Sequence, residues 1–518
     1  MPLCRLTCFG SPIRVQASAS EPSPCACTLR LVEFIKSRLP KSTFARNLTL
    51  MAGGTAAGQA FTIAASPILS RLYEPSDFGL LSVYASVVAI AAVVSSLAYY
   101  HAIPAPEADD DGANLTVLSL ALVLLTTIGS GIAIAVFRAD FERAFGIPGL
   151  ARYVIAVPLG VLGLSCYEVL SQWAARKNAF GVLAKTSAQR SVLQTGLQLV
   201  GGFLSVGKVG LIFGQLMGQW GGTLQVARHS WRGDRATFRA ITMRSLLGVA
   251  SRFRRFPKFT LPGAMLNAID VNVAPLLFAH FFGVGVAGYF ALGNRLVAVP
   301  FGLIANSAQR VFYPAAAAAK HKGTVATETA ATYLHLLRLV LPIVLIMTTC
   351  APELFTVLMG APWREAGVYM QWLSLRACFT MIVFPLTPLV FVLDRQAAGS
   401  VFSGMQLVVR IGAVWVGSRY GDARLAVALL GVGTGCLWLG YLFYLLAISG
   451  NRVLGAIGQL LRETAIAAAI ASPIVLIKLL HASDLGVTIA ASVCGIVAVG
   501  AIARRSGIRL RPKPAGAP

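Results

Sequence analysis

The stretch SPILSRLYEPSDFG, residues 66–79, ends one long apolar segment and opens the next. A second stretch, APLLFAHFFGVGVAG at residues 274–288, has the same order of features: a proline before the segment ends, a short turn, and a glycine opening the next segment. The match indicates an internal repeat of two parallel halves, related by an axis along the membrane normal.

The composition of the chain is typical of a membrane protein. Of its 518 residues, 56% are hydrophobic and only 12% are charged, whereas soluble proteins carry about 25% charged residues. The net charge of +24 would suggest nucleic acid as a partner of a soluble protein. Because basic residues of membrane proteins gather in cytoplasmic loops, we expect no nucleic-acid binding here. The composition predicts an all-α polytopic membrane protein.

Apolar windows of about 20 residues predict fourteen transmembrane helices. They lie at 48–70, 79–103, 114–137, 153–173, 187–206, 209–228, 259–282, 286–308, 331–350, 367–392, 398–418, 424–448, 463–481 and 485–503. The very short connection at Gly207 and the Ala/Ile-rich last pair leave twelve spans as the alternative. Lys and Arg residues gather on the side of the N-terminus, which predicts that both termini are cytoplasmic.

These spans predict two six-helix bundles around a central cavity, followed by an extra helix pair. We expect the N-terminal tail to be disordered, and its Cys4, Cys8, Cys25 and Cys27 lack further ligands at zinc spacing, so no metal site is predicted. The basic linker is expected to lie on anionic lipid. The predicted parts are a cytoplasmic tail (1–43), the first bundle (44–229), a basic cytoplasmic linker (230–258), the second bundle (259–450), the extra pair (451–503) and a basic cytoplasmic tail (504–518).

Four arginines lie within apolar spans of the second half: Arg295, Arg338, Arg376 and Arg410. A charge at bilayer depth usually faces a bundle interior or a water-filled cavity. Arg338 lies nearer the cytoplasmic end of its span, so snorkelling to the interface is an equal alternative. The arginines predict a cationic cavity for an anionic substrate.

Two carboxylates are candidates for ion coupling. Asp270 lies at mid-span, where it could carry a proton or sodium ion or form an ion pair with Arg295 on the next span. Glu168 lies nearer the cytoplasmic end of its span, where a carboxylate is unremarkable.

The deep polar groups of the first half are amides rather than charges. Such amides either bind sugar hydroxyls or form hydrogen bonds between helices, which is the commoner role. Together with two asparagines of the second half, they give five candidate glycan contacts. These are Gln59, Gln194, Gln198, Asn267 and Asn306.

Three stretches resemble the oligosaccharide flippase (Wzx-type, polysaccharide transporter) family of the MATE/MOP superfamily. They are LSRLYEPSDFGLLSVYAS at 69–86, AIPAPEADDDGANL at 102–115, and GYFALGNRLVAVPFGLIANSAQRVFYP at 288–314. In the third, Arg295 and Pro300 match a recurrent arginine and proline of the family's eighth span. The resemblance covers residues 44–450. The chain differs in its two extra spans and in an acidic turn, Glu107 to Asp111, that has no basic residue.

The resemblance implies a flippase, not an enzyme, that uses no cofactor. It would move undecaprenyl-pyrophosphate-linked oligosaccharides across the bacterial inner membrane by alternating access, for O-antigen, capsule or exopolysaccharide assembly. Arg295 would contact the pyrophosphate or an acidic sugar, with Arg376 and Arg410 nearby. Implied partners are the lipid-linked oligosaccharide, membrane lipids, and a glycan polymerase with its chain-length regulator.

Two alternatives remain from the sequence. A cation-coupled multidrug or small-molecule exporter of the same superfamily would need an acidic cavity, which the arginines argue against. A membrane-embedded glycan polymerase or ligase would carry its chemistry on a large outer loop, whereas the predicted outer loops are short. The sequence has no GxxxxGK[ST] motif, so we expect no direct use of ATP.

Overall fold

The computed structural model describes residues 43–136, 156–480 and 483–505. Nearly all of these residues are helical, and none of them lies in a strand. The predicted N-terminal tail with its four cysteines, and most of the predicted C-terminal tail, lie outside the described residues.

Fourteen helices in this part of the chain overlap the fourteen predicted spans, which confirms the predicted all-α fold class. The predicted span 209–228 is interrupted, because its helix ends at Trp220 and a separate helix begins at Thr223 after two glycines. Nine of them are long and apolar enough to cross a membrane, so the chain is a multi-pass membrane protein. The fourteen are α2 (Thr43–Leu72), α3 (Pro75–Ser95), α4 (Asp109–Val136), α7 (Ala156–Arg176), α8 (Phe180–Phe203), α9 (Lys208–Trp220), α13 (Leu261–Phe282), α14 (Val284–Lys322), α15 (Val325–Met359), α16 (Arg364–Val383), α18 (Gln396–Arg419), α19 (Ala423–Ile448), α20 (Val453–Leu479) and α21 (Asp484–Arg505).

Short helices fill several of the connections. They are η1 (Tyr99–Ala102), α10 (Thr223–Gly233), α11 (Arg235–Arg239), α12 (Met243–Arg252), η2 (Phe256–Thr260), η3 (Ala361–Trp363), η4 (Phe384–Leu386) and α17 (Leu389–Val392).

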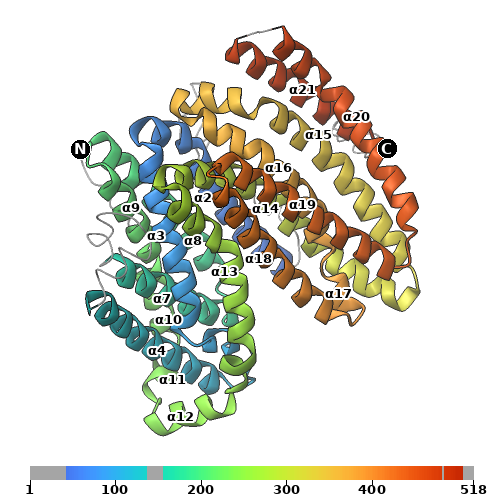
Figure 1. Cartoon of the computed structure of the whole chain (residues 1–518). Helices are drawn as coiled ribbons and strands as arrows, with labels where there is room; N and C mark the ends of the chain where they lie inside the picture. Colours follow the sequence, from blue (N-terminus) through green and yellow to red (C-terminus); the bar gives the residue numbers. More distant parts are fainter. Residues whose placement is uncertain (1–42, 137–155, 481–482, 506–518) are drawn as a thin grey trace, which may run out of the picture. The chain divides into compact units, whose positions relative to one another are not determined.

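The helices pack in the same pairs in the two halves. In the first half, α4 packs against α7, α7 against α9, and α9 against α8. In the second half, α15 packs against α16, α16 against α19, and α19 against α18. The extra helices α20 and α21 both pack against α15, beside which they lie in Figure 1. The repeated pairing agrees with the internal repeat in the sequence.

Two glycines at matching places in this repeat bring α3 and α14 together. A Cβ atom at Gly79 would overlap the carbonyl oxygen of Val284, and a Cβ atom at Gly288 would overlap that of Pro75. At the same end, the Trp363 indole Nε1 donates a hydrogen bond to the Ser70 carbonyl oxygen at 2.8 Å. The two halves therefore meet closely at the end that is predicted to be outside.

We expect Gly288→Val to destabilise the protein by about 1–3 kcal/mol, because the overlapping atom is backbone and cannot move aside. Gly285→Val is the matched control, since the space around Gly285 on the same helix is open. Thermal unfolding of the two purified variants measures the difference. Equal melting temperatures would contradict the close crossing of α3 and α14.

The linker between the halves is folded against the first half; its expected contact with anionic lipid stays a prediction. Val249 of α12 is buried beside Tyr99 and Trp173. The Trp173 indole donates to the Asp234 carboxylate at 3.1 Å, and Lys177 forms an ion pair with Asp234 at 3.0 Å. Figure 1 shows α11 and α12 beside the beginning of α4. The sequence overlooked this packing because the linker is dominated by arginines. Its exact boundaries, and those of the two bundles, stay predictions.

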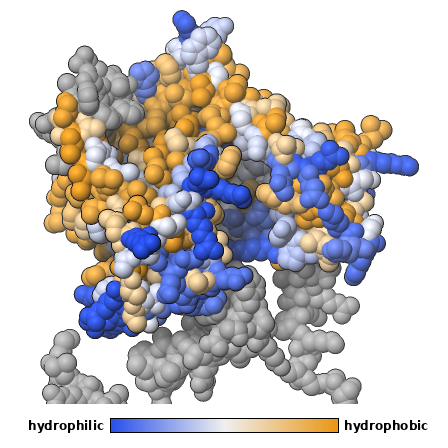
Figure 2. Space-filling view, turned by 90° about the horizontal axis from the view of Figure 1, so that it is seen from below, coloured by the Kyte–Doolittle hydropathy of each residue, from blue (hydrophilic) through white to orange (hydrophobic). Residues whose placement is uncertain are grey.

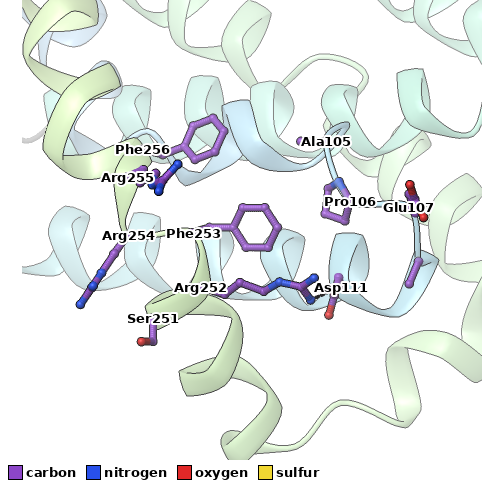
Figure 3. A pocket seen from close by; sticks show the side chains of 11 residues that line it. Ala105, Pro106, Glu107, Asp111, Ser251, Arg252, Phe253, Arg254, Arg255 and Phe256 are labelled. Carbon is purple, nitrogen blue, oxygen red and sulfur yellow. Dashed lines mark hydrogen bonds and ion pairs between the residues drawn. The ribbon is translucent and has the colours of Figure 1, made fainter.

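An open pocket of about 1040 Å³ lies where the end of this linker meets the turn before α4. Figure 3 shows Phe253 facing Pro106 across it, with Arg252 reaching Asp111 and Arg254 pointing away. The ion pair of Arg252 with Asp111, at 2.8 Å, is largely exposed, so it stabilises the contact by no more than about 1 kcal/mol. Figure 2 shows hydrophilic residues gathered on the face seen from below and hydrophobic residues beside them.

Candidate functional site

A cavity of about 680 Å³ lies within the second half, among α13, α14, α16, α18 and α19. Five residues that the sequence singled out line it: Asn267, Asp270, Asn306, Arg376 and Arg410. Further polar lining residues are Thr380, Thr387, Gln396, Ser400, Ser403 and Gln406. The structure therefore brings candidate site residues from four separate helices to one cavity.

The charged residues of this cavity lie at similar depth. Asp270 is twelve residues before the end of α13, Arg376 is twelve after the start of α16, and Arg410 is nine before the end of α18. With a helical rise of 1.5 Å per residue, they lie roughly 14 to 18 Å below the end predicted to be outside. This is near the middle of a hydrocarbon core that is about 30 Å thick.

The charges of the cavity are only partly compensated. Arg410 Nη2 lies 3.4 Å from Asp270 Oδ2, and Arg376 Nη2 donates to Asn294 Oδ1 at 2.7 Å. The Nε atoms of both arginines and Oδ1 of Asp270 are buried and have no hydrogen-bond partner. Such an atom costs about 1–3 kcal/mol when it stays unsatisfied. Unsatisfied polar groups beside a cavity are typical of a site that takes up water, an ion or a ligand.

Comparison with known proteins identifies the family. The family described as polysaccharide biosynthesis protein matches residues 68–367, more than half of the chain. The chain belongs to this polysaccharide biosynthesis protein family. The match includes most of the first half, Arg295 and Arg338, and it ends before Arg376.

One relative and three solved structures are similar to this chain. Teichuronic acid biosynthesis protein TuaB of Bacillus subtilis is 22% identical over 274 residues, 52% of this chain and 54% of that protein. The chain thus spans about half the length of this relative. The lipid II flippase MurJ in an inward closed conformation has a TM-score of 0.67 and 12% identity, covering 88% of this chain and 99% of that one.

Two transporter structures are similar over a slightly smaller part of the chain. A MOP-superfamily transporter from Pyrococcus furiosus has a TM-score of 0.51 and 16% identity, covering 82% of this chain and 96% of its own. A MATE protein in complex with MaL6 has a TM-score of 0.51 and 17% identity, covering 78% and 96%. These likenesses show that this polysaccharide biosynthesis protein has the fold of MurJ and the MATE transporters.

Arg295 does not line the cavity, although it shares a helix face with residues that do. Ala298, Gly302 and Asn306 line it, and Arg295 precedes them by three, seven and eleven residues on α14. The Arg295 side chain is partly buried and has no ion-pair or hydrogen-bond partner within the described residues. Arg295 thus lies on the cavity-facing side of α14, closer than these three residues to the end predicted to be outside. Asp270, for which Arg295 was one expected partner, pairs with Arg410 instead.

Arg338 lies outside the cavity, on the face of α15 that contacts α20. Its Nε atom is 3.2 Å from Oε1 of Glu463, whose side chain is only 6% exposed. The sequence left the role of Arg338 open because its partner lies 125 residues away in the extra helix pair. The structure gives this arginine a role in holding α20 against the second half.

We expect Arg338→Gln to lower the free energy of unfolding by about 1–2 kcal/mol, since it removes a charge-assisted contact that is partly open to solvent. Transport by the folded protein should stay close to that of the wild type, because the cavity is unchanged. Melting temperature and transport of the purified variant check both statements. A transport defect with an unchanged melting temperature would indicate that Arg338 contacts the substrate instead.

Two of the candidate amides of the first half form hydrogen bonds between helices. Gln194 of α8 bonds to Gln215 of α9, and Gln198 donates to the Leu211 carbonyl oxygen at 3.2 Å. Gln59 of α2 is partly buried and lines no part of the cavity in the second half. Glu168 lies on α7, also outside that cavity. The structure therefore does not bring these four residues to the charged site.

Sequence reasoning missed an aromatic group at the same cavity. Phe402 stacks on Tyr441 with ring centroids 4.1 Å apart, and Trp438 packs edge-on against Phe402 at 4.8 Å. All three rings line the cavity. Aromatic residues within an apolar span look like ordinary core, and the signal in the sequence was weak: Phe402 directly precedes Ser403, a polar residue within the span that also lines the cavity.

Proposed function

We propose that this protein is a flippase that moves a lipid-linked oligosaccharide across the bacterial inner membrane by alternating access. The carrier is undecaprenyl pyrophosphate, both termini are cytoplasmic, and the product serves O-antigen, capsule or exopolysaccharide assembly. The observation that carries the proposal is the cavity at membrane depth, where two arginines have buried Nε donors without partners.

The charge balance of the cavity favours an anionic cargo. Two guanidinium groups, those of Arg376 and Arg410, face the single carboxylate of Asp270. A phosphate or carboxylate offers the acceptor oxygens that their unused donors lack, and guanidinium groups bind such anions through paired hydrogen bonds. The pyrophosphate or an acidic sugar supplies this group, and Arg295 contacts it nearer the end predicted to be outside.

The rest of the cavity suits the glycan part. Asn267 and Asn306 provide amides for sugar hydroxyls, and the rings of Phe402, Trp438 and Tyr441 provide apolar faces. A volume of about 680 Å³ lies within the usual range for small-molecule sites, and it accommodates a part of a repeat unit. The lipid tail stays outside the cavity, in contact with membrane lipids.

Alternating access requires the close contact of the halves to open. Trp363 and Gly288 of the second half contact Ser70 and Pro75 of the first half at the end predicted to be outside. Cargo leaves when these contacts break. An anion bound to Arg410 competes with Asp270, and the released carboxylate takes a proton or sodium ion that drives the return. Glu168 is a second candidate for this coupling. A glycan polymerase and its chain-length regulator use the delivered repeat units.

A cation-coupled exporter is the alternative for this fold, because MATE structures share it. The arginine excess in the cavity argues against a cationic drug as cargo.

Deletion of the gene in its host, followed by mass spectrometry of the lipid-linked glycans, tests the proposal. Complete repeat units should accumulate on their lipid carrier, whereas an unchanged pool, or one of incomplete units, would contradict it.

A further inference from the structure

A second crevice, of about 410 Å³, lies in the first half, where α4, α7, α10 and α11 meet. Its walls are largely apolar and include Val117, Leu120, Leu170 and Phe238. Arg228, Ser230, Trp231 and Arg232 border it from α10 and its end. This lining shares no residue with the cationic cavity of the second half.

The crevice lies near one surface of the membrane. Leu120 is eleven residues after Asp109, the first residue of α4, and Leu170 is six residues before Arg176, the last residue of α7. At 1.5 Å per residue, the apolar wall begins roughly 10 Å inside the helix ends. Trp231 is 49% exposed, and an exposed tryptophan is typical of the boundary between headgroups and acyl chains.

Several polar groups at this crevice have no partner. Arg228 and Arg232 are exposed, and within the described residues neither forms an ion pair or a hydrogen bond. Ser230 is only 5% exposed, and its hydroxyl is buried without a hydrogen-bond partner. A buried hydroxyl beside two free guanidinium groups points to a ligand that carries acceptor oxygens.

We propose that this crevice binds one anionic phospholipid, with its phosphate between Arg228 and Arg232 and one acyl chain along Val117, Leu120 and Leu170. A free phosphate would leave the apolar walls without a partner. A zwitterionic lipid would place a second positive charge beside the arginines. The site is independent of the proposed cargo, since it lies on other helices.

Native mass spectrometry of the full-length protein, titrated with phosphatidylglycerol or phosphatidylcholine, tests this proposal. Arg228→Gln with Arg232→Gln should weaken phosphatidylglycerol binding about thirtyfold, because each basic residue near the surface contributes about fivefold. The matched control is Arg239→Gln with Arg244→Gln, which removes two exposed arginines of the same linker that do not border the crevice. This control should bind like the wild type.

A third variant, Leu120→Trp, fills the apolar wall and keeps both arginines, so it should also weaken binding if an acyl chain lies there. Circular dichroism melting of each variant shows that it is folded, and Leu120→Trp alone decides the matter if the double variant does not fold. Unchanged phosphatidylglycerol binding in the folded crevice variants would overturn the proposal. Equal binding of phosphatidylcholine by the wild type, or full displacement by an equal concentration of glycerol 3-phosphate, would overturn it as well.

Discussion

Arg376→Gln is expected to reduce translocation of the lipid-linked cargo by about 10- to 150-fold, because a hydrogen bond to a charged group contributes about 1.5–3 kcal/mol. The helices α14 and α16 also pack against each other away from the contact of Arg376 with Asn294, so the protein should stay folded. Arg376→Lys should be intermediate, since an ammonium group supplies charge without the paired donors of a guanidinium group.

The measurement for Arg376→Gln is the initial rate of translocation in proteoliposomes at equal amounts of folded protein. Arg338→Gln is the control, because it removes an arginine of the same half that lies outside the cavity. If both variants transported alike, the cavity would not be the path of the cargo.

The Asp270 and Arg410 pair should give the largest change in stability. Arg410→Met leaves the buried Asp270 carboxylate uncompensated, which should lower the free energy of unfolding by about 3–5 kcal/mol. Asp270→Asn with Arg410→Met should recover most of this loss, because no uncompensated charge remains. Unfolding of the wild type, both single variants and the double variant, followed by circular dichroism, gives the coupling between the two residues.

Transport measurements on the same four proteins distinguish a loss of stability from a loss of transport. The double variant should be nearly as stable as the wild type and yet inactive, because it lacks both the arginine that we propose to bind the anion and the carboxylate that we propose for ion coupling. Additive losses of stability, with no recovery in the double variant, would contradict a direct ion pair. An active double variant would show that neither group is needed by the cargo.

The sequence was sufficient for the all-α membrane fold and for the order of its long helices. Apolar windows locate helices, and the repeat at residues 66–79 and 274–288 predicted two related halves whose glycines Gly79 and Gly288 meet in the structure. Depth within apolar spans singled out Arg376, Arg410 and Asp270, because a deep charge must face a polar interior, and the three residues line one cavity in the structure.

Contacts between residues that lie far apart in the chain could not be predicted from the sequence. Arg338 is held by Glu463, Asp270 by Arg410 and not by Arg295, and Gln198 by the Leu211 backbone. Each of these pairings depends on which helices become neighbours, and apolar windows carry no such information. The packing of the linker could not be predicted for a similar reason, since the burial of Val249 depends on the surface that the first half presents to it.

The central claim is that the protein moves an anionic, lipid-linked glycan across the membrane and that the arginines of the second half bind it. It is tested most directly with purified protein in proteoliposomes that contain undecaprenyl-pyrophosphate-linked oligosaccharide and neither ATP nor a sugar donor. The wild type should move the glycan to the opposite leaflet without forming new glycosidic bonds, and Arg376→Gln should not. No movement by the wild type, or equal movement by the variant, would contradict the account.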